Sequence, residues 1–124
     1  MDYTKYLSIP FVPNGRTMDG CDCYGLVRLL LTDLYGKLLP LFANDETEYA
    51  PLINSGLATI GATGIPKPEE GALVILRYLG LPVHIGLCID GTRVIHTEKF
   101  KGVHIEALSS RHIASRIVGF YRVH

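Results

Sequence analysis

The sequence predicts an α+β fold, with an N-terminal helix packed on a C-terminal antiparallel β-sheet of about five strands. Apolar residues recur at helical spacing between Cys23 and Leu38. After Gly71 the sequence consists of short segments rich in Val, Ile and Tyr, separated by turn residues. A helix followed by a run of strands is the order typical of α+β proteins, whose helices and strands form separate layers.

One helix is predicted from Cys23 to Leu38. Asp22 stands where an N-cap residue belongs, and Pro40 follows the last apolar position. The apolar positions that define the helix are Leu26, Val27, Leu30, Leu34 and Leu38. Residues 1–20 hold two prolines and two glycines among mixed polar residues, so they predict an irregular lead-in.

Five strands are predicted in the second half of the chain. They span Ala72–Tyr78, Val83–Ile89, Thr92–Glu98, Val103–Leu108 and Arg116–Val123. Before them, Asn44–Asn54 predicts a second, short helix, because Asp45 and Glu48 have capping-box spacing. The glycine- and proline-rich segment Ser55–Gly71 predicts a long loop, which is either the rim of a binding site or a simple connection.

The composition fits one domain over residues 1–124. Hydrophobic residues make up 48% and charged residues 19%, which is typical of a folded domain and not of a disordered chain. The 12 basic residues balance the 12 acidic ones without a basic cluster, so we expect no nucleic-acid partner. No apolar stretch approaches the roughly 18 residues of a membrane span, and the N-terminus lacks a signal-peptide pattern. We therefore expect no membrane partner, and synthesis in the cytoplasm without a signal peptide.

The chain has three cysteines, an odd number that cannot form a disulfide framework. Among them, Cys23 has the setting of a reactive thiol. If Asp22 caps the helix, Cys23 lies beside unpaired backbone N–H groups and the positive end of the helix dipole. This setting lowers the pKa of a thiol, and the N–H groups could stabilise an oxyanion. Gly25 would keep the first turn slim enough for a substrate. Cys21 precedes the cap and Cys88 lies in a predicted strand, so neither has this help; a buried, inert thiol is the alternative for Cys23.

A nucleophilic cysteine needs a base, and His84 and His96 lie in the two arms of one predicted hairpin. A two-residue turn would place the two rings on opposite faces of the sheet. A three-residue loop over residues 89–91, with Gly91 left-handed, would place His84 directly opposite His96, and an equivalent odd offset would also put them on one face. Gly86 would leave space on that face for a helix terminus or a substrate.

The other histidines receive no role from the sequence. His104 lies on a probable edge, His112 lies in a polar surface stretch, and His124 is the C-terminal residue and is expected to be frayed. A zinc site formed by Cys21, Cys23, His84 and His96 is a further alternative, but Cys-x-Cys matches the usual zinc spacing poorly. We therefore expect no metal and no cofactor.

Four segments together resemble the NlpC-type cysteine peptidases, which are papain-like endopeptidases of bacterial cell-wall peptides. They are DCYGLV at 22–27, GALV at 71–74, HIGL at 84–87 and VIH at 94–96. The resemblance runs from about Pro10 to the end of the chain, with the order Cys, His, His. The longer string PFVPNGRTMDGCDCYGLVR at 10–28 is similar in particular to the branch found in phage and prophage tail-tip proteins.

This resemblance implies a papain-like fold, with Cys23 as nucleophile, His84 as base and His96 as the residue that orients His84. Asp22 matches the family's acidic residue before the cysteine, and it would support the oxyanion site as the N-cap beside the N–H group of Cys23. The implied substrate is the γ-D-glutamyl–diamino acid amide of a peptidoglycan stem peptide. The implied partners are phage tail-tip proteins, and the implied place of action is the cell wall, reached within a phage tail or after lysis.

Three positions depart from the family pattern. Tyr24 replaces the usual serine after the nucleophile, and Ala72 replaces the usual aspartate after Gly71. The family's upstream tyrosine has no clean match; Phe11 stands near that position and cannot donate a hydrogen bond to an oxyanion. A catalytically weak or inactive module of a phage tail tip is therefore the alternative to the peptidase, and an amidase or transpeptidase would use the same residues.

Overall fold

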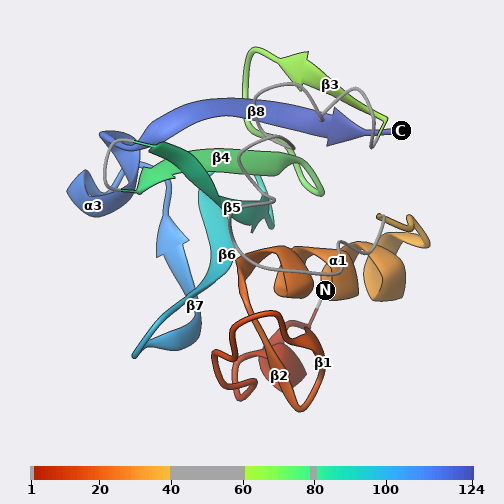
Figure 1. Ribbon diagram of the computed structural model, residues 1–124. Helices are drawn as coiled ribbons and strands as arrows, with labels where there is room; N and C mark the ends of the chain where they lie inside the picture. The colour runs from red at the N-terminus through yellow and green to blue at the C-terminus, as the bar shows by residue number, and fades with distance from the viewer. Residues whose placement is uncertain (1, 40–60, 79–80) are drawn as a thin grey trace.

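The computed structural model describes residues 2–39, 61–78 and 81–124. It contains one main helix, α1 (Cys23–Tyr35), and a six-stranded sheet with the order β3-β8-β4-β5-β6-β7 (Figure 1). The strands are β3 (Ala62–Ile65), β4 (Leu73–Tyr78), β5 (Leu81–Cys88), β6 (Arg93–Glu98), β7 (Gly102–Ala107) and β8 (Ile117–Val123). Every neighbouring pair in this sheet is antiparallel. The predicted α+β fold is confirmed, and none of the described helices is long and apolar enough to cross a membrane.

Helix α1 begins where the sequence predicts and ends earlier. Asp22 has an extended backbone, and its carboxylate accepts a hydrogen bond from the N–H group of Gly25 at 2.9 Å, which is the N-cap interaction. At the other end Gly36 adopts a left-handed conformation with φ 64°, and the N–H group of Lys37 returns to the carbonyl of Leu31. Because glycine takes this conformation without steric cost, it stops the helix at Tyr35, and the predicted end at Leu38 is wrong.

The five predicted strands are all present, with ends that differ by at most two residues. The sixth strand, β3, was not predicted; it lies inside the segment expected to be a loop, and it pairs with β8 at the edge of the sheet. Its sequence ATGI has a central Thr-Gly pair and little apolar character, so its pattern alone does not indicate a strand. The predicted helix Asn44–Asn54 and residues 55–60 of the predicted loop lie outside the described residues.

The predicted lead-in is largely irregular in residues 2–20, and short elements interrupt it. They are the 3₁₀ helix η1 (Thr4–Tyr6) and a small hairpin formed by β1 (Arg16–Thr17) and β2 (Gly20–Cys21). This hairpin packs against α1 (Figure 1). A further one-turn helix, α3 (Arg111–Ala114), precedes β8 and was also not predicted.

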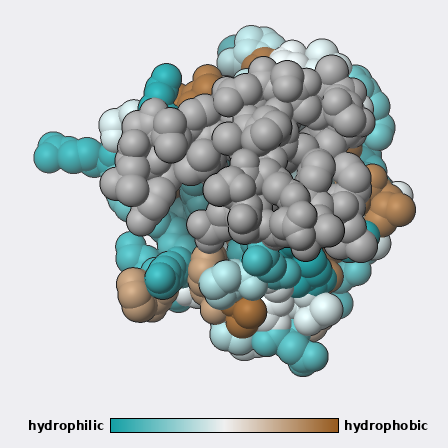
Figure 2. Space-filling view, in the orientation of Figure 1, coloured by the Kyte–Doolittle hydropathy of each residue, from teal (hydrophilic) through white to brown (hydrophobic). Residues whose placement is uncertain are grey.

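The core lies on both faces of the central strands. Helix α1 contributes apolar side chains to a cluster with alternate residues of the sheet, among them Leu26, Leu30, Leu73, Ile75, Ile85, Leu87 and Ile95. The intervening residues form a second cluster, which includes Ala72, Val74, Leu76, Cys88, Val94 and Ile113 of α3. On the face drawn in Figure 2, the apolar residues of the described surface stand apart among polar ones.

The β5–β6 hairpin has a three-residue loop, which keeps His84 and His96 on one face of the sheet. The loop lies one residue later in the chain than predicted. Leu87 pairs with Ile95, and the N–H group of Ile89 donates to the carbonyl of Arg93, so the loop is residues 90–92. The Asp90 carboxylate closes this loop by accepting from the N–H groups of Thr92 and Arg93. The predicted loop at 89–91 with a left-handed Gly91 is therefore wrong, since the aspartate and not the glycine forms the turn.

Gly86 makes room for the neighbouring strand. A Cβ atom at this position would lie 2.6 Å from Cγ2 of Val94 and 3.2 Å from Cβ of His96. The space beside Gly86 is thus taken by β6, and the expectation that a helix terminus or a substrate enters there is wrong.

Gly86→Ala is expected to lower the free energy of unfolding by about 1–3 kcal/mol, because the added methyl group overpacks a buried strand pair. Denaturant unfolding followed by circular dichroism measures the change. Gly64→Ala in edge strand β3 is the matched control, since a Cβ there would meet Tyr121 at an ordinary 3.7 Å. Equal stability losses in the two variants would contradict this account of the β5–β6 contact.

Candidate active site

Cys23 differs from the other two thiols in its exposure. Cys23 keeps 8% of its surface exposed, whereas Cys21 and Cys88 are fully buried. Burial, together with the nearby carboxylates of Asp22 and Asp90 respectively, raises the pKa of both Cys21 and Cys88 to about 12, so these two thiols are protonated and inert. None of the three cysteines, all in the described part of the chain, forms a disulfide. Cys23 is thus the cysteine of the three that keeps some exposed surface.

Asp22 is a buried carboxylate held by three donors. Besides the N–H group of Gly25, it accepts from the N–H group of Asn14 at 3.1 Å and from Nη1 of Arg16 at 2.7 Å. The charge pair with Arg16 offsets the cost of burying the carboxylate. The same side chain therefore caps the helix that begins at Cys23 and fastens the loop and hairpin before it to that helix.

The space beside Gly25, in the first turn of α1, is filled by the protein. A Cβ atom on Gly25 would collide with the carbonyl oxygen of Gly15. Gly25 thus permits the Gly15 loop to approach the helix, and the expectation that it admits a substrate is wrong. Tyr24, at the position of the usual serine, is fully buried, and the guanidinium of Arg16 lies 5.6 Å from the centre of its ring.

His84 and His96 come together as the odd offset requires. Nε2 of His84 and Nδ1 of His96 are 2.8 Å apart and share a hydrogen bond. Helix α1, whose first residue is Cys23, packs against β5 and β6, the strands that carry the two histidines. The structure therefore joins two of the three predicted catalytic residues directly, and it places the third at the end of an element packed on their strands.

Glu106 extends this pair into a chain of three side chains. Its Oε2 lies 2.6 Å from Nε2 of His96, whose ring is fully buried. Burial alone would raise the pKa of Glu106, but the hydrogen bond from His96 and the other histidines beside the carboxylate outweigh it and lower the pKa, so the carboxylate is ionised. Burial, followed by the neighbouring His96, lowers the pKa of His84, so its ring is neutral at rest.

These contacts determine where the protons lie. An ionised carboxylate only accepts hydrogen bonds, so Nε2 of His96 carries the proton that it donates to Glu106. Burial lowers the pKa of His96, so this ring is neutral. Nδ1 of His96 is then an acceptor, and Nε2 of His84 donates to it. This assignment follows from the hydrogen-bond partners, and it leaves a lone pair on Nδ1 of His84. A histidine with one free lone pair can act as a general base.

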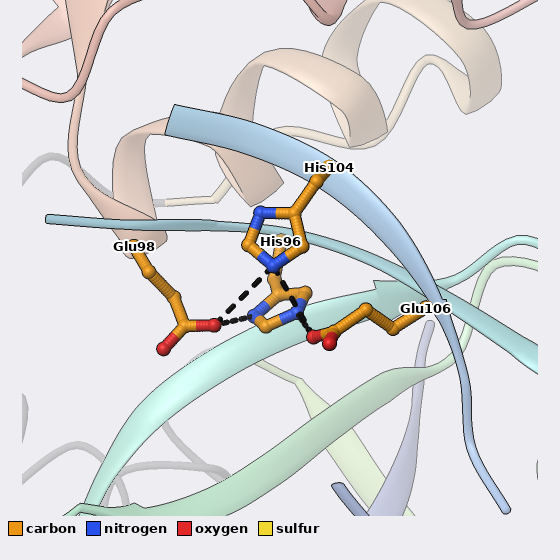
Figure 3. Close-up of side chains that lie close together, drawn as sticks. All are labelled: His96, Glu98, His104 and Glu106. Carbon is orange, nitrogen blue, oxygen red and sulfur yellow. Dashed lines mark hydrogen bonds and ion pairs between the residues drawn. The ribbon is translucent and has the colours of Figure 1, made fainter. Parts of the chain in front are cut away.

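His104 and Glu98 complete a cluster around His96 that the sequence did not predict (Figure 3). His104 pairs with His96 across β6 and β7, and its Nε2 lies 3.2 Å from Glu106 and 3.3 Å from Glu98. The sequence does contain a signal that His104 lies with the other residues of this cluster. His96-x-Glu98 and His104-x-Glu106 are two His-x-Glu motifs in consecutive strands, and period-two spacing puts each pair on one face.

The remaining histidines and the alternative zinc set are also placed. His112 is exposed as expected, with Nε2 3.4 Å from Glu98. His124 is not frayed, because its N–H group donates to the carbonyl of Gly61 and its ring contacts Thr63. Among the described residues, the donor atoms that gather closely enough for a metal belong to His96, Glu98, His104 and Glu106, so the set with Cys21 and Cys23 is wrong.

Residues 8–122 match the NlpC/P60 family, and the chain belongs to this family. It is similar to an NLP/P60-family, lipoprotein-like protein of Staphylococcus aureus, with 25% identity over 96% of this chain and 38% of that chain, and a TM-score of 0.67. It is also similar to the NlpC/P60 domain of the peptidoglycan hydrolase SagA, with 18% identity, 98% and 92% of the two chains covered, and a TM-score of 0.67. A Bacillus cereus NlpC/P60 protein shares 19% identity over 95% of this chain and 36% of that chain, with a TM-score of 0.72.

These matches confirm the papain-like α+β fold that the resemblance implied. A search of curated proteins finds no match. The chain spans little more than a third of the length of the Staphylococcus and Bacillus proteins and nearly all of the SagA domain.

Asp22→Ala is expected to lower the free energy of unfolding by about 3 kcal/mol, because it removes the helix cap and the carboxylate that Arg16 pairs with. Asp19→Ala, an exposed aspartate in the β1–β2 turn, is the control and should change stability by less than about 0.5 kcal/mol. Urea unfolding measures both variants. A loss at Asp22 no larger than at Asp19 would contradict the anchoring role of the buried carboxylate.

Proposed function

We propose that this protein is a cysteine endopeptidase that hydrolyses amide bonds of peptidoglycan stem peptides. The observation that carries the proposal is the hydrogen-bonded chain from Glu106 through His96 to His84, on strands that pack against the helix beginning at Cys23. Membership of the NlpC/P60 family supports it, as does the similarity to a domain of a peptidoglycan hydrolase. The γ-D-glutamyl–diamino acid bond is the proposed site of cleavage.

In the proposed mechanism, Nδ1 of His84 accepts the proton of the Cys23 thiol. The resulting thiolate attacks the amide carbonyl, and the N–H group of Cys23 at the helix start helps to hold the oxyanion. His84, now protonated, gives its proton to the leaving amine, and a thioester remains on Cys23. His84 then takes a proton from water, the hydroxide attacks the thioester, and the carboxylic acid product leaves as the thiol is restored.

His96 and Glu106 serve this mechanism without touching the substrate. His96 accepts from Nε2 of His84, which fixes the tautomer of His84 and supports its positive charge. Glu106 does the same for His96 through the 2.6 Å contact. The base is thus held ready by two positioning residues.

We further propose that the protein acts at the cell wall, as a part of a phage tail tip or after lysis. The similarity of residues 10–28 to the tail-tip branch supports this placement. The second candidate function is a catalytically inactive module of such a tail tip. Phe11 favours this candidate, because it lies beside Cys21 and offers no hydrogen-bond donor for an oxyanion. Rapid alkylation of Cys23 by iodoacetamide near neutral pH, relative to free cysteine, would favour the enzyme.

Cys23→Ala is expected to abolish hydrolysis, because no other side chain of this site supplies a nucleophile. The purified protein is incubated with peptidoglycan or a γ-D-glutamyl–diaminopimelate peptide, and fragments are identified by mass spectrometry. Cys88→Ala, which removes a buried thiol of the second core cluster, controls for the loss of a thiol as such. Cleavage that survives Cys23→Ala would reject the assignment, and transfer products in place of hydrolysis would indicate a transpeptidase.

Glu106→Gln is expected to lower kcat roughly tenfold or more with little change in KM, because a neutral amide no longer fixes the tautomer of His96. Glu69→Gln, which removes the charge of an exposed carboxylate paired with Arg122, is the matched control and should leave kcat unchanged. A KM effect alone would show that Glu106 binds the substrate and does not position His96.

A further inference from the structure

We propose that His96, Glu98, His104 and Glu106 form a binding site for a divalent transition metal ion of the Zn²⁺ class, and that the bound ion inhibits the site. One ligand atom from each of these four residues lies within 4.8 Å of the other three (Figure 3). The proposed ion is not a cofactor, so it does not conflict with the expectation from the sequence. It would inhibit by binding to atoms of the positioning residues His96 and Glu106.

The orientation of His104 is the first observation that indicates a cation. Nδ1 of His104 lies 2.9 Å from the carbonyl oxygen of Gly102, so this nitrogen donates a hydrogen bond to the carbonyl. Nε2 faces two carboxylate oxygens at 3.2 and 3.3 Å. A ring nitrogen between two carboxylates is stable with a positive ion at that place, either a proton on Nε2 or a metal bound to it. Histidines that bind metals are oriented by this kind of backbone contact.

Two of the spacings between donor atoms fit tetrahedral coordination, and Glu98, whose Oε1 lies 3.8 Å from Nδ1 of His96, would have to move toward an ion on Nε2. Zinc bonds of about 2.0–2.1 Å to nitrogen and oxygen place neighbouring ligand atoms about 3.3 Å apart. The two contacts of His104 with Glu98 and Glu106 already have this separation. The contact of His96 with Glu106, at 2.6 Å, would open by about 0.7 Å as the ion replaces the proton between them.

The donor set and its accessibility select the kind of ion. Two imidazoles and two carboxylates suit Zn²⁺ and its neighbours better than Mg²⁺ or Ca²⁺, which prefer oxygen alone. The side chains of Glu98, His104 and Glu106 are 17%, 23% and 21% exposed, whereas that of His96 is fully buried. An ion from solvent therefore meets the three outer ligands first and His96 last.

A bound ion would change which ring nitrogens of His96 and His84 carry protons. The inhibition that follows from this change rests on the proposed function. Metal coordination at Nε2 of His96 releases the proton held there, and Nδ1 of the same ring takes over the proton that Nε2 of His84 had donated to it. Nδ1 of His96 then donates to Nε2 of His84, so the neutral His84 ring carries its proton on Nδ1. Overall one proton leaves Nε2 of His96 and one is taken up at Nδ1 of His84. The lone pair that accepts the thiol proton is thereby lost, without any metal contact to Cys23.

The binding test uses the whole chain and Co²⁺ as a spectroscopic probe for Zn²⁺. We expect one Co²⁺ per chain with a tetrahedral visible spectrum, displaced by Zn²⁺ and retained in Cys23→Ala. His104→Asn is expected to weaken binding by about a hundredfold or more, since a ligand is lost. His112→Asn, an exposed histidine at the rim of the same cluster, is the matched control and should change the affinity by less than about threefold. No binding to the native chain, or equal affinity in His104→Asn, would overturn the site.

The inhibition test compares hydrolysis with and without Zn²⁺ in each variant, relative to that variant's own metal-free rate. We expect Zn²⁺ to inhibit the native chain, EDTA to restore it, and His104→Asn to resist the same Zn²⁺ concentration. Inhibition that persists in His104→Asn would show that the ion acts at Cys23 and would overturn the proposed inhibition through His96. A chain with no hydrolase activity would reject the proposed function and its inhibition, while the Co²⁺ result would still decide the site.

Discussion

The short hydrogen bond between His96 and Glu106 sets the chemistry of the whole site. It is made between a fully buried ring and an ionised carboxylate, so it has one possible donor. With the donor fixed at Nε2 of His96, Nδ1 of the same ring accepts the 2.8 Å hydrogen bond from Nε2 of His84. A basic lone pair is then left on Nδ1 of His84. The chain of three side chains thus works as a unit, in which the last residue determines the state of the first.

The sheet supplies the geometry for this unit through two backbone features. The three-residue loop of the β5–β6 hairpin keeps His84 and His96 on one face of the sheet. Because Gly86 has no side chain, His96 can lie close beside β5. The direct pairing of His96 with His104 then brings Glu106 into range from β7. Helix α1 adds a thiol whose position depends on Asp22, because that carboxylate fixes both the helix start and the preceding loop.

Local chemistry explains which features the sequence could predict. The helix start and all five predicted strands depend on residues close in the chain, such as the Asp22 cap, and were predicted to within two residues. The predicted end of α1 was wrong because Gly36 stops the helix, although apolar residues continue beyond it. The predicted position of the β5–β6 loop was wrong because the side chain of Asp90 closes the loop. Glu106 was missed because its contact depends on the β6–β7 register, which the spacing of one motif does not reveal.

The proton positions in the chain can be measured directly by ¹⁵N NMR of the imidazole rings, with Glu106→Gln as the comparison. The account predicts that in the native, metal-free protein both His84 and His96 carry their proton on Nε2 and an unprotonated Nδ1. A native His96 ring with its proton on Nδ1 would contradict it, because His84 could then no longer present a free lone pair to a thiol.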